Sequence, residues 1–351
     1  MTAVYRQRDL AGFASSLFKA AGLKPDRAEI GAAVLVEGDL LGRDTHGLAQ
    51  LPAYLNALAT GTMARDAEIV TVSDHGAVAV WDGQRNLGPW LVHTGIELGM
   101  QRARQYGVFN LAIRRSHHIA ALSAYLKRAT DEGFLVILSS SDPSTASVAP
   151  PGGTQAMITP NPMAAGIPTG GAPVLIDISM STTTNGMVER HRREGRNLPY
   201  PWLLDADGVI SDDPEVFFTE PKGSILPLGG KDLGYKGFSM GFLTEILTSA
   251  LSGFGRADPS EGWGASVFLQ VLWPDAFGGA SEFQRQADHL VKIALDNKRV
   301  KDGPAVRLPG RQALALRDKQ LREGVGLHPS IIPALEPWAL KLDVPLPTPL
   351  G

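Results

Sequence analysis

Cysteine is absent from the 351 residues of this chain. The protein therefore has no disulfide, no thiolate nucleophile, no cysteine-ligated zinc and no iron–sulfur cluster. An excess of one charge is lacking too, because 33 basic and 36 acidic side chains leave a net charge of −3. A nearly balanced chain has no strong field to attract nucleic acid or an anionic membrane, so we expect neither as a partner.

Long apolar runs are missing as well. No stretch approaches the roughly 20 apolar residues that cross a bilayer, and the charged start MTAVYRQRDL lacks the apolar segment of a secretory signal. We therefore expect a soluble, cytoplasmic protein. Glycine and proline are plentiful, with 39 and 25 residues, which predicts many tight turns and ordered loops.

The usual signatures of nucleotide and metal sites do not occur. No G-x-G-x-x-G joins a strand to a helix, and G-x-x-x-x-G-K-[ST] and H-E-x-x-H are absent. Gly262-Trp263-Gly264 precedes a strand-like run, whereas a Rossmann turn follows its strand. The adjacent His117 and His118 would project in different directions, so no metal site is expected.

Helical patterns at both ends of the chain flank a middle that mixes strands and helices. Strands are expected over 68–72, 77–81, 108–113, 134–138, 174–178 and 265–272, and helices over most of the first 60 residues and over 88–106, 119–132, 237–251, 281–299 and from 312 and 330 onward. Neither helical end has much apolar surface to bury alone. We therefore predict a discontinuous helical domain, 1–66 with 300–351, and an α/β domain over 67–299.

Two histidine segments are candidates for chemistry. His46 lies in a glycine-flanked turn between helices, where it shapes a site or supports the cap of the next helix. Ser116-His117-His118 stands where a strand gives way to a helix, and such junctions commonly face a cleft. Imidazole is the usual proton donor near neutral pH, although a solvated pair at a helix start has the same pattern. The residues alone indicate an enzyme with a histidine in a cleft.

A nucleophile-elbow match offers a different chemistry. Gly237-Phe238-Ser239-Met240-Gly241 fits the G-x-S-x-G of serine hydrolases. That turn needs a buried strand directly before it, and residues 228–236 read instead as a glycine-rich loop. A helix start with small residues is the favoured interpretation, and a hydrolase using Ser239 is a remote alternative.

A series of short segments follows a recognisable order along the chain. The segments are G-R-D-T-H-G at 42–47, S-H-H at 116–118, P-G-G at 151–153 with N-P at 161–162, D-I-S-M-S at 177–181, the stretch 199–208, L-P-L-G-G at 226–230 with K-G at 236–237, and P-G at 309–310. Together they resemble the type-2 malate/L-lactate dehydrogenase family, over roughly residues 8–345. That family includes ureidoglycolate and sulfolactate dehydrogenases and piperideine-carboxylate reductases.

The resemblance implies a fold, a cofactor and a reaction. The fold is α/β (α+β), with a non-Rossmann nicotinamide-binding domain of mixed or antiparallel sheet and helices, next to a helical domain built from both chain ends. The protein would be a homodimer that transfers hydride between NAD(P) and a small 2-oxo or 2-hydroxy acid, or a related cyclic imine. The matching nucleotide-contacting positions are Ser141, Asn161, Asp177, Ile178, Ser179, Lys236, Pro309, Gly310 and Arg311.

His118 matches the family's proton donor and acceptor. As an imidazolium it would stabilise the developing alkoxide and then deliver the proton. The resemblance places His46 and Thr45 at the substrate subsite. Asp142, close in sequence to the cofactor loop, is the candidate to orient His118 or raise its pKa.

One departure from the family pattern concerns the charge of the substrate. The family has a carboxylate-binding arginine three positions after the last glycine of the His46 motif, and Gln50 stands there in this chain. Arg115 and Arg43 are the candidate replacements. The change also leaves open a member that binds nucleotide without ordinary catalysis.

The choice between NAD and NADP stays open. Arg311 replaces a residue that is often Glu or Gln, and its charge suits a 2′-phosphate. The basic cluster His191, Arg192, Arg193 and Arg196 suits either the same phosphate or a solvated helix face. The balance favours NADP slightly.

Overall fold

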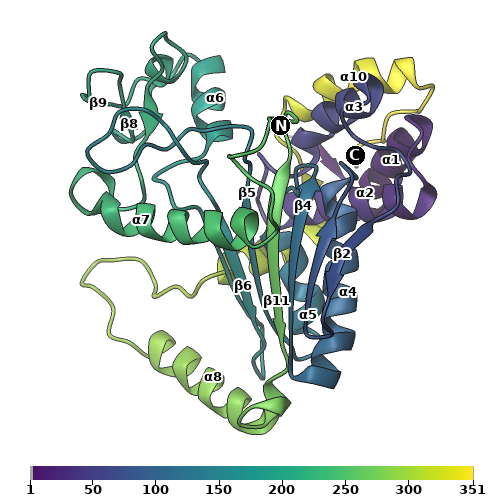
Figure 1. Cartoon of the computed structure of the whole chain (residues 1–351), viewed down its shortest axis with the longest axis vertical. Coiled ribbons are helices and arrows are strands. Elements are labelled where there is room, and N and C mark those ends of the chain that lie inside the picture. The colour runs from purple at the N-terminus through teal and green to yellow at the C-terminus, as the bar shows by residue number, and fades with distance from the viewer. Residues whose placement is uncertain (1–2, 351) are drawn as a thin grey trace.

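A seven-stranded sheet forms the centre of the computed structural model, which describes residues 3–350 (Figure 1). Its order is β2 (Val70–Asp74), β3 (Val78–Asp82), β4 (Val108–Ser116), β11 (Ala265–Leu272), β5 (Leu135–Ser141), β6 (Met163–Ile167) and β7 (Val174–Ile178). Of the neighbouring pairs in this sheet, β3 and β4 are parallel and the others are antiparallel. The mixed α/β class expected from the sequence is confirmed.

Strand β11 comes late in the chain yet lies between β4 and β5. Its alternate residues Val267, Leu269 and Val271 are fully buried, which is the pattern of a strand with one face against a core. Leu269 pairs with Leu111 of β4 and with Leu138 of β5. An apolar row therefore crosses three strands and holds their ends in register.

Helices cover the sheet and form both ends of the chain. The described residues contain α1 (Gln7–Ala20), α2 (Pro25–Leu40), α3 (Leu51–Thr60), α4 (Gly88–Tyr106), α5 (Ser123–Thr130), α6 (Asn185–Arg193), α7 (Gly230–Glu245), α8 (Ala280–Leu295), α9 (Arg311–Glu323) and α10 (Ile331–Lys341). Within residues 3–350, none of them has the length and apolar character needed to span a membrane.

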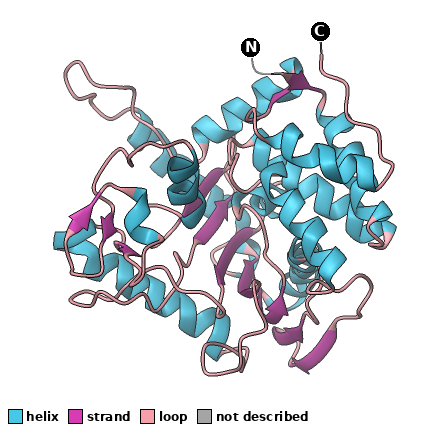
Figure 2. Ribbon diagram, turned by 90° about the horizontal axis from the view of Figure 1, so that it is seen from above, coloured by secondary structure: helices cyan, strands magenta, loops and turns pink. Residues whose placement is uncertain are grey.

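The two ends of the chain lie side by side (Figure 2). Strand β1 (Val4–Tyr5) pairs antiparallel with β12 (Val325–Gly326), α10 packs on α3, and α9 packs on α2. Gln320 of α9 donates to the backbone carbonyls of Asp39 and Leu40 at 3.0 Å each, so α9 holds the C-terminal end of α2. The domain boundaries near 66 and 300 stay a prediction.

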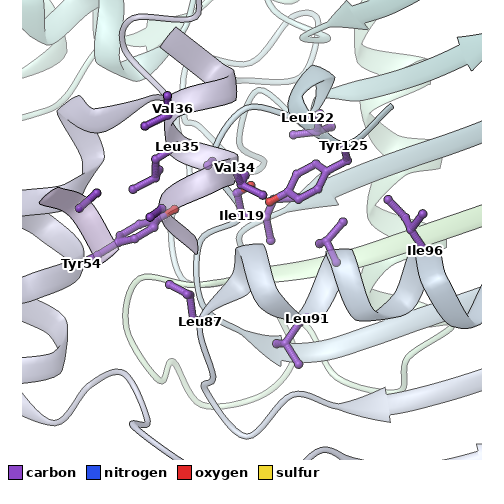
Figure 3. Close-up of a cluster of buried hydrophobic side chains, with 14 of the residues drawn as sticks. Val34, Leu35, Val36, Tyr54, Leu87, Leu91, Ile96, Ile119, Leu122 and Tyr125 are labelled. Atoms are coloured by element: carbon purple, nitrogen blue, oxygen red, sulfur yellow. The ribbon is translucent and has the colours of Figure 1, made fainter. Parts of the chain in front are cut away.

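One apolar core joins the N-terminal helices to the α/β middle of the chain. Figure 3 shows Val34 of α2 beside Tyr125 of α5, with Leu91 of α4 in the same cluster. A second, smaller cluster of buried residues lies in the segment 148–225, around a three-stranded sheet of β10 (Ser224–Ile225), β8 (Leu203–Leu204) and β9 (Ile210–Ser211).

Gly88 sets the distance between α4 and the backbone that follows β4. A Cβ at this position would overlap the carbonyl oxygens of His117 and His118. These are backbone atoms, which cannot swing aside as the end of a side chain can. The start of α4 therefore supports the main chain of the histidine pair directly.

We expect Gly88→Ala to lower the apparent unfolding free energy by about 1–3 kcal/mol, because the new methyl group forces the two backbones apart. Gly12→Ala on α1 is the matched control. Nothing lies within 4 Å of its added Cβ, so better helix propensity should stabilise it by up to about 1 kcal/mol. Urea melts of both variants provide the measurement, and equal midpoints would contradict the close contact.

Candidate active site

One end of the central sheet brings together segments that lie far apart in the sequence. The register places Ser116 of β4 beside Ala265 of β11, Ser266 of β11 beside Ser141 of β5, and Met163 of β6 beside Ile178 of β7. Strands β5 and β6 are themselves neighbours, with Ser139 opposite Met163. The segments that adjoin this end of the sheet are 117–118, 142–145, 161–162, 179–183 and 262–264.

His118 is the histidine of the pair that a ligand can reach. Its side chain is half-buried, whereas His117 is 1% exposed and burial lowers the pKa of His117 to about 3. The Nδ1 atom of His118 lies 2.8 Å from the hydroxyl of Tyr54 and 3.3 Å from the backbone nitrogen of Ala120. Tyr54, fully buried on α3, also lies 3.0 Å from the carbonyl oxygen of His118.

The contact from Ala120 favours one tautomer of the neutral His118 ring. The backbone N–H of Ala120 can only donate, so Nδ1 accepts and the proton belongs on Nε2. Burial, with the nearby His46 and His117, holds the pKa of His118 well below its usual value. Burial therefore favours the neutral ring in the free protein, and the imidazolium role of His118 stays a prediction.

Trp263 covers one face of the His118 ring. The two rings are stacked, with centroids 4.9 Å apart and an angle of 28°. Arg85 fastens the tryptophan loop through bonds to the carbonyls of Gly262 and Trp263, at 3.3 and 2.8 Å. The loop that precedes β11 therefore serves to hold an aromatic ring against the histidine.

Asp142 does not contact His118 as the sequence suggested. Its carboxylate accepts from the backbone nitrogens of Ser144, at 2.9 Å, and Gly264, at 3.4 Å, and within residues 3–350 it makes no hydrogen bond to His118. Asp142 instead tethers the residue next to Trp263. The side chain that bonds to the His118 ring is that of Tyr54.

His46 lies opposite His118, with ring centroids 5.9 Å apart and an angle of 32°. The hydroxyl of Thr45 lies 2.8 Å from Nδ1 of His46. Burial lowers the pKa of His46, and Asp177 opposes that shift. The structure thus brings His46, Thr45 and His118 together, as the sequence predicted.

Asp39 anchors the loop that carries His46. Its Oδ2 accepts from the backbone nitrogen of Leu48 at 2.8 Å, and a Cβ at Gly47 would overlap the carboxylate. The other oxygen, Oδ1, has no hydrogen-bond partner among the described residues. Burial raises the pKa of Asp39 to about 7.

The three candidate substrate-binding residues have different surroundings. Gln50 donates to the carbonyl of Thr45 at 2.7 Å, so its amide stabilises the His46 loop. Arg115 is already paired with the carboxylates of Asp82, at 3.4 Å, and Glu261, at 3.0 Å, which speaks against its use for a substrate. Arg43 lies next to the loop, 3.4 Å from Asp177.

The expected nucleotide positions fall into two groups and one separate residue. Pro309 accepts from the backbone of Leu175 in β7, which places the 309–310 turn beside Asp177, Ile178 and Ser179. Ser141 and Asn161 contact α7 and the π-helical turn after it, through Thr248, Gly241 and Glu245. Lys236 is exposed on α7.

The hydrolase interpretation is wrong. Helix α7 begins at Gly230, so the segment expected to be a loop before residue 237 is mostly helix. Ser239 lies inside this helix and donates to the carbonyl of Tyr235 at 2.7 Å. No strand precedes it to form the strained turn of a nucleophile elbow.

Sequence reasoning missed Tyr54, Trp263 and Arg190. Tyr54 follows the helical spacing of an ordinary core residue, and Trp263 stood out only because it lies between two glycines. Arg190 directly precedes the basic cluster of residues 191–196 and was not counted in it. In the structure it crosses to the His46 loop and bonds to Asp44 at 3.0 Å, whereas Arg192 pairs with Glu215 on the surface.

A comparison with known families identifies the family of the chain. The malate/L-lactate dehydrogenase family model matches residues 5–336, so the chain belongs to that family. It is therefore related to dehydrogenases of 2-hydroxy acids, and an oxidoreductase is supported.

Individual relatives cover nearly the whole chain. L-sulfolactate dehydrogenase of Methanothermobacter thermautotrophicus is 28% identical over 338 residues, covering 94% of each chain. (2R)-3-sulfolactate dehydrogenase (NADP(+)) of Chromohalobacter salexigens is 29% identical over 348 residues, covering 97% of this chain and 99% of its own. The solved delta1-piperideine-2-carboxylate reductase of Pseudomonas syringae pvar. tomato superimposes with a TM-score of 0.82 at 26% identity, covering 96% and 100% of the two chains.

The buried carboxyl of Asp39 makes a pH-dependent contribution to folding. The raised pKa means that this contribution is complete below about pH 4 and is lost as the pH rises toward about 7. We expect wild type to lose up to about 4 kcal/mol over this range relative to Asp39→Asn, which carries no charge. Urea melts at several pH values measure the difference, with Asp26→Asn on the exposed side of α2 as control. Parallel pH profiles for wild type and Asp39→Asn would contradict the assignment.

Proposed function

We propose that the protein is an NAD(P)-dependent oxidoreductase that transfers hydride between the nicotinamide and a small 2-oxo or 2-hydroxy acid, with His118 as proton donor and acceptor. The observation that carries this proposal is the geometry of His118, whose Nδ1 contacts Tyr54 and Ala120 and whose Nε2 makes no hydrogen bond within residues 3–350. The names of the relatives support the substrate class.

The residues beside β7 suit a dinucleotide. Ile178 is 45% exposed and offers an apolar surface, and the hydroxyl of Ser179 lies next to it. Gly310, with φ +77°, lies so close to β7 that a Cβ would be 2.6 Å from the Cβ of Leu175. Helix α9 begins directly after it at Arg311, and helix starts favour anions. Apolar surface, hydroxyl and positive charge together match rings, ribose and phosphates.

A bound nicotinamide would supply or take up the hydride. During reduction, His118 protonated on both ring nitrogens would donate the Nε2 proton to the oxygen that gains negative charge, and the ring would be left neutral. During oxidation, Nε2 must be free to accept. The Tyr54 hydroxyl then accepts from a protonated Nδ1 while donating to the carbonyl of His118, so one partner serves both directions.

The sheet end also suits a cyclic imine, since the same Nε2 proton can go to a nitrogen. The relative named as a piperideine-carboxylate reductase favours keeping this alternative. For the nucleotide we propose NADP, because Arg311 is exposed at the start of α9. We do not assign this phosphate to the α6 cluster, since Arg192 and Arg196 are paired with Glu215 and Glu194.

We expect wild type to oxidise NADPH or NADH with members of a panel of 2-oxo acids and cyclic imines. His118→Ala should lower turnover by at least about 10²-fold, because it removes the proton donor. Binding of the reduced nucleotide, followed by its fluorescence, should change little. His75→Ala, in an exposed turn, is the control. Unchanged turnover in His118→Ala would remove His118 from this role, and nucleotide binding without turnover in wild type would favour a binding protein.

We also propose a homodimer that uses α7 and α8, which both lie outside the central sheet (Figure 1). Helix α8 has no buried residue, and its apolar side chains Leu290 and Ile293 are 63% and 49% exposed. On α7, Leu243 and Phe242 are exposed as well. Exposed apolar side chains on both helices are typical of an interface between chains.

Light scattering should give twice the chain mass of 37.4 kDa for wild type. Leu243→Glu combined with Leu290→Glu should shift the protein to monomer, since two charges would be buried without partners. Leu340→Glu, at an 87% exposed position of α10, should leave the dimer intact. A monomeric wild type, or a dimer that survives the double change, would refute this face.

A further inference from the structure

An ion pair connects α6 to the loop that carries His46. Nη1 of Arg190 donates to Oδ2 of Asp44 at 3.0 Å. A Cβ at Gly186, near the start of the same helix, would lie 3.8 Å from the Cβ of Thr45. Helix α6 therefore runs along the histidine loop, although the two segments are more than a hundred residues apart.

This places a guanidinium close to His46, one of the two facing imidazoles. His46 is two residues from Asp44, and its ring faces the ring of His118 at 5.9 Å. The positive charge of Arg190 is near enough to His46 to contribute to the lowering of its pKa. An anion bound beside His46 would thus lie within the field of Arg190.

The guanidinium of Arg190 is the cation best suited to such an anion. Its side chain is 17% exposed, against 41% for Arg43, so its charge is screened less by water. Among residues 3–350 its hydrogen bond to Asp44 is the one present, which leaves Nε and Nη2 for a two-point contact. Arg43 instead directs its Nε toward Asp177 and Ser123.

We propose that Arg190 binds the anionic group of the substrate, a carboxylate or sulfonate, and so supplies the charge that Gln50 lacks. This inference rests on the proposed function. Asp44 holds the guanidinium in place before the substrate arrives, so little side-chain freedom is lost on binding. Gln50 keeps the loop folded through Thr45, and Arg190 recognises the charge.

The test compares Arg190→Gln and Arg190→Lys with Arg192→Gln, a change two residues along the same helix. With the best 2-oxo acid of the panel, Arg190→Gln should raise KM for the acid by about 10–100-fold, because a charged two-point contact is lost. Its kcat should change less than KM does. Arg190→Lys should recover part of the affinity, and Arg192→Gln should match wild type.

Two further readouts separate the possible outcomes. The affinity for NADPH should stay unchanged in Arg190→Gln, and a loss there would assign Arg190 to a cofactor phosphate and overturn the proposal. Calorimetry with oxamate, a non-reacting carboxylate, in the presence of NADH or NADPH tests anion binding without turnover. An unchanged KM or oxamate affinity in Arg190→Gln overturns the proposal while the dehydrogenase function stands. A wild type that turns over no substrate refutes the function, and oxamate then still decides the role of Arg190. If Arg190→Gln does not fold, the affinities of Arg190→Lys decide instead.

Discussion

The contact between the Tyr54 hydroxyl and Nδ1 of His118 is the interaction on which the site depends. It joins α3 to the residues that follow β4, and the N–H of Ala120 favours a ring proton on Nε2. A neutral hydrogen-bond partner such as Tyr54 affects the pKa of the imidazole differently from a carboxylate. It orients the imidazole without stabilising a positive charge, so burial keeps the ring neutral. The uncharged ring is the form that acts as a base during oxidation, whereas donation during reduction requires that the ring first take up a proton.

The sheet register explains why such a site forms at this end of the molecule. Because β11 lies between β4 and β5, the tryptophan loop before β11 and the histidine pair after β4 come together. Trp263 and His46 then flank the imidazole on separate elements, with ring centroids at 4.9 and 5.9 Å from it. The long-range connections from Arg85 to the tryptophan loop and from Arg190 to the histidine loop hold these elements in their relative positions.

Features that depend on neighbouring residues could be predicted from the sequence. The mixed α/β class followed from periodicity, and His118 followed from its place at the end of a strand and from the order of the motifs. Tyr54 could not be identified in this way, because its partner is 64 residues away and its own helix gives it the pattern of a core residue. Asp142 was assigned to His118 because it is close in sequence to the cofactor loop. Closeness in sequence, however, does not fix where a carboxylate points. The start of α7 was placed too late because glycines suggest a loop, yet Gly230 and Gly234 are part of the helix.

The most direct test of this account is nitrogen NMR of ¹⁵N-histidine-labelled protein, with the His118 signals assigned by His118→Gln. The account predicts a neutral ring with the proton on Nε2 throughout the range from about pH 6 to about pH 8. It also predicts that Tyr54→Phe alters the Nδ1 signal most. A His118 ring that titrates near its ordinary value of about 6.5, or one that carries its proton on Nδ1 in the free protein, would contradict it.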